Sequence, residues 1–212
     1  MTPGPDAQPP GQPDPDGTGV GRPRAWLVRH GETEWARLGR HTSRTDVPLT
    51  EPGRSQAVAV ARTRAGATFA EVFTSPLSRA LDTARIAGFG ERAELLDDLR
   101  EWDYGADEGR TTPDIRADRP GWTIWTDGPR DGETIAAVGA RADRVVARVQ
   151  AATGDVLLFA HGHVLRILAA RWLGLPAIDG RLLALSTATV SVLGWERETA
   201  VILRWNEACV PG

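Results

Sequence analysis

Residues 25–33 read AWLVRHGET, four apolar residues followed by an arginine, a histidine and a glycine. A short apolar run that ends near a glycine is typical of a buried strand that stops at a loop. The carboxyl ends of strands in an open α/β sheet are where ligands bind. The stretch therefore predicts a nucleophile, His30, in an anion pocket beside Arg29. A purely structural hydrogen-bonding role for His30 is the alternative.

In the rest of the chain, segments with the apolar pattern of strands alternate with segments that have the apolar pattern of helices. Strands are expected at 25–28, 71–74, 155–160, 187–195 and 200–205, with an extended segment at 93–99. Helices are expected at 50–64, 77–87, 112–117, 134–152 and 164–173, the second of them capped by Ser75 or Ser78. This alternation predicts an α/β fold with a mostly parallel sheet covered on both faces.

Composition limits the class of protein. The chain has 212 residues, of which 41% are hydrophobic, and this fits one domain with its own core. The net charge of −3 gives no basic surface, so we expect no nucleic-acid partner. All 25 basic residues are arginine, which excludes Schiff-base chemistry through lysine. The single cysteine, Cys209, excludes an internal disulfide and argues against a cysteine nucleophile.

The N-terminal segment differs from the rest. Residues 1–23 contain seven prolines and five glycines, so we expect a disordered leader followed by one domain at 24–212. No apolar run approaches the length of a membrane span, and the first residues lack the pattern of a signal peptide. A cytoplasmic protein without a membrane partner is expected. The sequence indicates no particular oligomeric state.

Two further expected strands end near charged residues. Residues 71–74 lead to Arg79 at the start of a helix, and residues 155–160 lead to His161. Glu101 lies in a polar and aromatic turn between them. Parallel strands leave a sheet at one edge, so these side chains are expected to meet His30. Each residue alone also has a structural interpretation, as a surface arginine, a solvated glutamate or a helix cap.

Together these residue types suit phosphoryl transfer. The forks of Arg29 and Arg79 match phosphate oxygens, and His161, if protonated, adds a third cationic donor at a helix start. His30 attacks phosphorus through one ring nitrogen if a carbonyl holds the other nitrogen as a donor. Glu101 protonates the departing alcohol and then activates water.

The chain that carries these residues resembles the histidine phosphatase superfamily over residues 24–206. The resemblance rests on RHGETEW at 29–35, GRHTSRTDVPLT at 39–50, SPLSRALDTA at 75–84, EWDYGADEG at 101–109 and HGHVLR at 161–166. It implies the phosphoglycerate mutase-like fold, a three-layer α/β/α sandwich. It also implies that His30 is phosphorylated, that Glu101 is the proton donor, and that Arg29, Arg79 and His161 bind the phosphoryl group. Substrate contacts are implied at Thr42, Ser43, Trp102, Asp103, Tyr104 and Gly162.

Two departures from the mutases of this family favour hydrolysis. Ala36 stands where mutases usually carry asparagine, and Glu101 and His161 are separated by only 161 − 101 = 60 positions. A short cover shields a phosphohistidine poorly from water. We therefore expect a phosphatase of small-molecule phosphate monoesters, including sugar phosphates and bisphosphates, with no cofactor and no metal. Mutase-type phosphoryl transfer is the alternative within the family.

Two alternatives come from other classes. A metal hydrolase would use His30, His161, His163 and Glu101, but paired arginines would repel a divalent metal. A non-catalytic phosphate-binding protein would not need the complete set of catalytic residues.

Substrate specificity is expected from the segment before His161. Four arginines in this segment could bind a second phosphate or carboxylate of the substrate: Arg110, Arg116, Arg119 and Arg130. We expect at least two of the four to be solvated instead. Trp122 and Trp125 are expected to wall the pocket, with packing on the sheet as the alternative. His41 is a candidate substrate contact, and His163 is expected to be structural.

Overall fold

The computed structural model describes residues 21–63 and 67–209. Of the leader predicted at 1–23, residues 1–20 lie outside the described residues. The last residues of that segment contact the sheet. The guanidinium of Arg22 lies 4.3 Å from the centre of the Trp195 ring, and the Trp195 indole donates a hydrogen bond to the carbonyl oxygen of Pro23.

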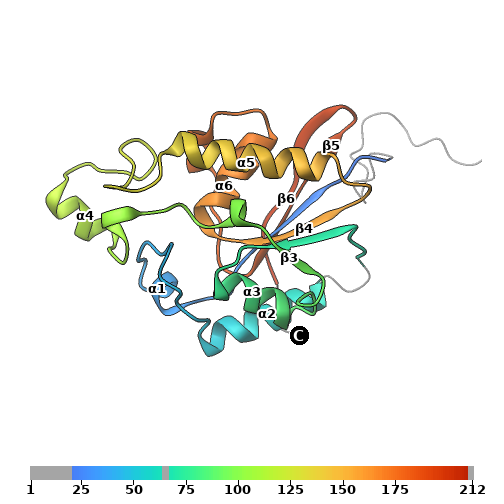
Figure 1. The fold of residues 1–212 in the computed structure, drawn as a ribbon, viewed down its shortest axis with the longest axis horizontal. Coiled ribbons are helices and arrows are strands. Elements are labelled where there is room, and N and C mark those ends of the chain that lie inside the picture. Colours follow the sequence, from blue (N-terminus) through green and yellow to red (C-terminus); the bar gives the residue numbers. More distant parts are fainter. Residues whose placement is uncertain (1–20, 64–66, 210–212) are drawn as a thin grey trace, which may run out of the picture.

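Six strands form one sheet, in the order β3-β2-β4-β1-β5-β6 (Figure 1). Their bounds are β1 (Ala25–Arg29), β2 (Glu71–Thr74), β3 (Ala93–Leu95), β4 (Val156–Ala160), β5 (Thr189–Glu196) and β6 (Thr199–Ala208). The four strands from β3 to β1 are parallel, and β5 and β6 are antiparallel additions at one side. The predicted α/β class with a mostly parallel sheet is confirmed.

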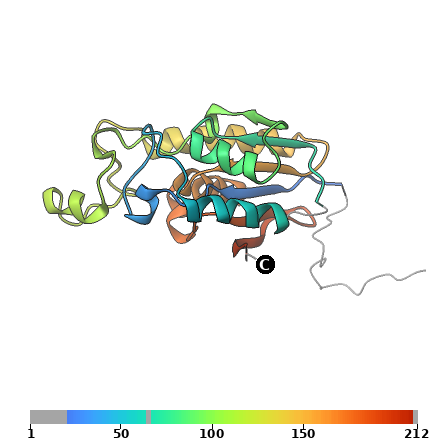
Figure 2. The ribbon, with the colours of Figure 1, turned by 90° about the horizontal axis from the view of Figure 1, so that it is seen from below.

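Helices cover both faces of the sheet (Figures 1 and 2). α5 (Ile135–Gln150) and α6 (Gly162–Trp172) pack on one face, and α2 (Glu51–Thr63) and α3 (Ser78–Ile86) pack on the other. The smaller helices are α1 (Glu34–Arg37), α4 (Thr112–Asp118), and the 3₁₀ turns η1 (Asp97–Leu99), η2 (Gly105–Asp107) and η3 (Ala177–Leu182). No helix within the described ranges is long and apolar enough to cross a membrane.

The central strand β4 shows why its sequence is apolar throughout. Val156 and Leu158 belong to the core beneath α5 and α6, whereas Leu157 and Phe159 belong to the core beneath α2 and α3. Side chains alternate between the faces of a strand, so a strand covered on both faces has no polar position. All five residues of β4 are buried.

Local structure differs from expectation at three places. The extended segment expected at 93–99 is a strand only to Leu95, because residues 97–99 turn into η1. Neither serine caps α3. Leu77 is the N-cap residue without a side-chain bond, and Ser75 accepts a hydrogen bond from the Leu77 amide at 3.3 Å. The unpredicted α1 has four residues, too few to produce a helical period.

Residues 101–134, here called the cap segment, extend beyond the carboxyl edge of the sheet (Figure 1). The segment contains η2 and α4. α4 begins with a capping box, in which Thr111 accepts from the Asp114 amide and Asp114 accepts from the Thr111 amide. Thr134 caps α5 by accepting from the Ala137 amide. The cap segment therefore joins the sheet edge to α5 through defined turns.

Candidate active site

Three neighbouring parallel strands bring their carboxyl ends together at one edge. β1 leads to His30, β4 to His161 and β2 to Ser75, and β4 lies between β2 and β1 in the sheet. The rings of His30 and His161 are 5.2 Å apart, centre to centre. The expected meeting of these strand ends is confirmed.

His30 is held in one tautomer. Its Nδ1 lies 2.7 Å from the carbonyl oxygen of Gly31, which only accepts hydrogen bonds, so Nδ1 carries the proton and Nε2 holds a lone pair. Burial lowers the pKa of His30 well below its usual range, and the charges of Arg79 and Arg29 lower it further. The ring is therefore a neutral base that lines a cavity.

The glycine after His30 is required by a close approach of two backbones. A Cβ atom on Gly31 would lie 2.3 Å from the carbonyl oxygen of Gly53, and one on Gly53 would lie 2.1 Å from that of Glu32. No side chain fits either position. The Gly31 amide also donates to the hydroxyl of Thr83 on α3 at 3.0 Å. The loop that carries His30 is thus fixed against both α2 and α3.

Arg29 presents a buried donor to the same cavity. One of its terminal nitrogens donates to the Leu185 carbonyl at 2.5 Å. Its Nε is buried and has no hydrogen-bond partner among the described residues. Burial lowers the pKa of this guanidinium, partly offset by Glu101. Buried donors without partners are rare in proteins, so this N–H marks a place for an acceptor such as a phosphate oxygen.

Arg79 is fully buried, and its charge lowers the pKa of His30. Its Nε donates to Nδ1 of His161 at 3.2 Å. Its terminal nitrogens donate to the backbone carbonyls of Thr42, Ser43 and Thr45. Arg79 thus ties the loop after α1 to the end of β4 and places a positive charge close to His30.

His161 is neutral in this arrangement. Arginine only donates, so Nδ1 of His161 accepts from Arg79, and Nε2 carries the proton toward the Ser75 hydroxyl at 2.8 Å. Burial and the charge of Arg79 lower the pKa of His161 well below its usual range. His161 in this state does not supply the third cationic donor that a protonated ring would have added. The cationic groups beside His30 are the two arginines.

Glu101 occupies the start of α6. Its carboxylate accepts hydrogen bonds from the amides of Trp102, His163 and Val164, each at 3.0 Å. The amides at the N-terminus of α6, expected to serve a phosphate, therefore hold Glu101 instead. Glu101 is 8% exposed and lines the same cavity as His30.

The cavity has a volume of about 420 Å³. From the predicted site it is lined by Arg29, His30, Glu101, Thr42, Tyr104 and Gly162. Trp122 and Trp125 wall it as expected, and His41 and Ala36 line it as well. His163, expected to be structural, also lines it, and its Nδ1 shares a hydrogen bond with the buried Tyr104 hydroxyl at 2.6 Å.

Five residues of the predicted site are not among the residues that line this cavity. Arg79 and His161 are fully buried and bonded to each other. The Ser43 hydroxyl donates a hydrogen bond to the Glu108 carboxylate at 2.5 Å, and the fully buried Trp102 packs within the core. Asp103 forms an ion pair with Arg44. These five side chains influence the cavity through the residues that they contact.

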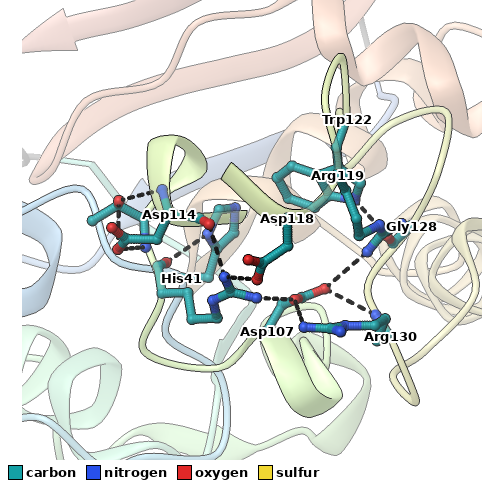
Figure 3. A network of polar contacts seen from close by, with 10 residues as sticks. His41, Asp107, Asp114, Asp118, Arg119, Trp122, Gly128 and Arg130 are labelled. Carbon is teal, nitrogen blue, oxygen red and sulfur yellow. Dashed lines mark hydrogen bonds and ion pairs between the residues drawn. The ribbon is translucent and has the colours of Figure 1, made fainter. Parts of the chain in front are cut away.

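The four arginines singled out in the cap segment separate into two groups. Arg110, Arg119 and Arg130 surround the buried carboxylate of Asp107, as Figure 3 shows. Arg116 lines the cavity, with its Nε on the Trp122 carbonyl at 2.8 Å. At least two of the four were expected to be solvated. Arg116 and Arg130 are exposed, whereas Arg110 and Arg119 are partly buried against Asp107.

Two arginines of the cavity were missed. Arg40 precedes the singled-out His41, and Arg166 lies on α6 one turn after Gly162 and His163. Helical spacing was the available signal for Arg166, because positions i, i+3 and i+4 share one face. Among the described residues, no cluster of three or more His, Cys, Asp or Glu side chains is arranged to hold a metal ion.

The buried histidines predict an acid-sensitive fold. Burial lowers the pKa values of His30, His161 and His163 in the folded state, whereas the unfolded chain takes up protons near pH 6.5. The unfolded state then binds more protons below pH 6.5, so stability is lost as the pH falls. We expect the free energy of unfolding to drop by up to about 1.4 kcal/mol per histidine for each pH unit below 6.5.

Urea unfolding at pH 7.5, 6.5 and 5.5 measures this loss. The range stays above the ordinary pKa values of the carboxylates, so their titration contributes little. A free energy of unfolding that is unchanged between pH 6.5 and 5.5 would contradict the assignment of three neutral histidines.

Comparisons with known proteins agree with this geometry. The family model described as the histidine phosphatase superfamily (branch 1) matches residues 25–208. An acid phosphatase of Mycobacterium tuberculosis is 42% identical over 191 residues, covering 87% of this chain and 94% of that protein. A sedoheptulose 1,7-bisphosphatase of Saccharomyces cerevisiae is 38% identical, covering 72% and 68%. The solved structure of an open reading frame product from Mycobacterium tuberculosis superimposes with a TM-score of 0.84 at 39% identity, covering 89% and 99%.

The fold and the site together define an enzyme of the phosphatase class. The chain belongs to branch 1 of the histidine phosphatase superfamily.

Proposed function

We propose that the protein hydrolyses small-molecule phosphate monoesters through a phosphohistidine on Nε2 of His30. The observation that carries this proposal is the neutral ring of His30 at the cavity, with Nδ1 held by the Gly31 carbonyl and the unpartnered Nε of Arg29 beside it. A phosphoryl acceptor needs a nitrogen with a free lone pair and a buried cationic donor, and the site supplies both.

In the first step, the lone pair on Nε2 of His30 forms a bond to phosphorus as the bond from phosphorus to the ester oxygen breaks. Glu101, which must start this step as the carboxylic acid, gives its proton to that departing oxygen and becomes a carboxylate. In the second step, the Glu101 carboxylate takes a proton from water as the water oxygen bonds to phosphorus. The N–P bond breaks, inorganic phosphate leaves, and both residues return to their initial states.

The charge that develops on phosphorus is met by Arg29 from the cavity wall and by the buried positive charge of Arg79. In this proposal His161 acts as a neutral link that orients Arg79, rather than as a third cation, because Arg79 donates to it. Glu101 faces Arg29 across Gly162, whose small size keeps this space open. A Cβ atom there would lie 3.4 Å from the Arg29 guanidinium carbon and 3.6 Å from a Glu101 oxygen.

The cavity favours a ring-shaped substrate with a second anionic group. Aromatic rings form its outer wall: His41, Tyr104, Trp122, Trp125 and His163. Arg40, Arg116 and Arg166 line it, and each donates to backbone carbonyls, with no ion pair to a carboxylate among the described residues. We therefore include sugar phosphates and bisphosphates in the proposal. A cytoplasmic location stays a prediction of the sequence.

A panel of phosphorylated metabolites, including sugar bisphosphates and 3-phosphoglycerate, tests this function. Each compound is scored for phosphate release and for isomerisation, with and without excess chelator. We expect phosphate release that the chelator leaves unchanged. Isomerised product without phosphate release would favour the mutase alternative, and activity restored only by added metal would contradict the proposed mechanism.

Arg116→Gln tests the second anionic group. Losing one charge-assisted hydrogen bond of about 1.5–3 kcal/mol predicts a fall of roughly 10- to 100-fold in kcat/KM for a sugar bisphosphate. A simple alkyl monophosphate should change by less than about twofold, because it has no second anion. Arg100→Gln is the matched control, since Arg100 is exposed and pairs with Asp97. Equal losses for both substrates with Arg116→Gln would contradict this role.

A further inference from the structure

The cap segment is held by one buried carboxylate that does not line the cavity. The side chain of Asp107 is 1% exposed and lies at the end of η2. Its oxygens lie 3.5, 3.3 and 3.6 Å from nitrogens of Arg110, Arg119 and Arg130, and one of them also accepts from the Arg130 amide at 2.9 Å (Figure 3). A buried carboxylate needs such compensation, so these segments have little freedom to move apart.

One arm of this network reaches the wall formed by His41. The carbonyl oxygen of Arg110 accepts from both the amide and Nδ1 of His41, each at 2.9 Å. The Arg110 side chain bonds Asp107 on one side and Asp118, at the end of α4, on the other. The position of the His41 ring therefore depends on where Asp107 holds residue 110.

The second arm reaches Trp122, whose ring packs against that of His41. Arg119 places its guanidinium 5.6 Å from the centre of the Trp122 ring. Arg119 and the Trp122 indole both donate to the carbonyl oxygen of Gly128, at 3.3 and 2.8 Å. The rings of His41 and Trp122 in turn contact each other edge to face, 5.5 Å apart. Asp107 is thus linked to both rings, to His41 through Arg110 and to Trp122 through Arg119.

The third arm closes the loop that follows. The Arg130 carbonyl accepts from the Ala106 amide at 2.8 Å. Gly105, with a φ of +50°, lies so close to this loop that a Cβ atom would come within 2.2 Å of the same carbonyl oxygen. Residues 105–107 and 130 therefore form one tightly packed junction around Asp107.

From these contacts we infer that Asp107 is a positioning residue that sets which leaving groups the cavity accepts. It acts through Arg110 and Arg119 on the rings of His41 and Trp122, and it touches neither His30 nor the phosphoryl group. This inference rests on the proposed phosphatase function, because it assigns the leaving group to the aromatic walls. The residues that react with the phosphoryl group at His30 and the cap-segment residues that select the leaving group are therefore separate parts of the site.

The substitution Asp107→Asn separates these parts. It keeps the shape of the side chain but removes the charge that holds three arginines. We expect kcat/KM to fall by roughly 10- to 100-fold for fructose 1,6-bisphosphate, through KM more than kcat, since small displacements of a binding wall have effects of this size. For acetyl phosphate, whose leaving group has two carbons, we expect a change of less than about twofold and an unchanged pH profile.

Asp118→Asn is the matched control. It removes a carboxylate from the same network, but that side chain is 56% exposed and pairs with Arg110 rather than with the cavity wall. We expect both substrates to react at wild-type rates. If Asp107→Asn does not fold, Arg119→Lys keeps the charge but loses the fork that joins Asp107 to Gly128. That variant should give the same preferential loss with the bisphosphate.

Hydrogen exchange provides a readout that needs no turnover. Amides of residues 119–130 should exchange faster in Asp107→Asn, while those of β4 keep their wild-type protection. Unchanged exchange at 119–130, equal losses for both substrates, or a lower melting temperature with an unchanged ratio of kcat/KM values would each overturn the inference. An inactive wild-type protein would instead count against the proposed function, and the exchange experiment would still show whether Asp107 holds residues 119–130 in place.

Discussion

His30→Ala should abolish both turnover and phosphorylation of the protein. The variant lacks the only ring nitrogen in the proposal that bonds to phosphorus, so we expect kcat to fall on the order of 10⁴-fold or more. The measurement is phosphate release together with covalent labelling by a radioactive phosphate donor, followed by denaturation and separation of bound label. The label should be acid-labile and absent from the variant.

His41→Ala is the control for this experiment. His41 is 8% exposed, lines the same cavity and also has Nδ1 against a backbone carbonyl, at 2.9 Å from Arg110. It lies on the aromatic wall, so its loss should raise KM and leave labelling intact. Label retained in His30→Ala, or lost equally in both variants, would refute His30 as the nucleophile.

Glu101→Gln should slow the release of poor leaving groups far more than that of good ones. An alkoxide needs a proton as it departs, whereas a nitrophenolate does not. We expect kcat/KM for an alkyl phosphate to fall by about 10²–10⁴-fold and for 4-nitrophenyl phosphate to fall much less. The amide side chain retains one oxygen to accept from the amides at the start of α6, so the fold should persist.

The second half of the reaction offers an independent check on Glu101. The carboxylate is proposed to activate water, so the phosphohistidine should accumulate in Glu101→Gln with 4-nitrophenyl phosphate. A burst of nitrophenolate followed by slow turnover would report this accumulation. Equal losses for both leaving groups, with no burst, would be inconsistent with proton transfer by Glu101. Glu108→Gln serves for comparison, because Glu108 binds Ser43 and lies outside the cavity lining.

Much of the fold could be predicted because its signals are local. β2 begins and ends where the sequence indicated, at Glu71 and Thr74, and β4 differs by one residue. Each is a short run of apolar residues between polar or turn-forming ones, and sheet burial then selects extended backbone. α1 and the 3₁₀ turns were not foreseen, because elements of three to six residues produce no period and depend on packing and caps.

The candidate site could also be predicted only in part. His30, Arg29 and Glu101 were predicted from their places at strand ends and in a polar turn, and the structure brings all three to one cavity. The neutral state of His161 could not be predicted, because it depends on Arg79, 82 positions away in the chain, donating to Nδ1. The role of Asp107 was likewise hidden, since its sequence neighbours do not reveal that three arginines converge on it.

The order of residues was enough to indicate the class of fold, the strand that presents His30 and the residue types for phosphoryl transfer, because hydrophobic period, glycine and charge act between near neighbours. The folded arrangement was needed to assign the protonated nitrogens of His30 and His161, and to tell the arginines that line the cavity from those that surround Asp107. Those properties follow from burial and from donors that approach across the sheet edge, and such distances exist only once the chain has folded.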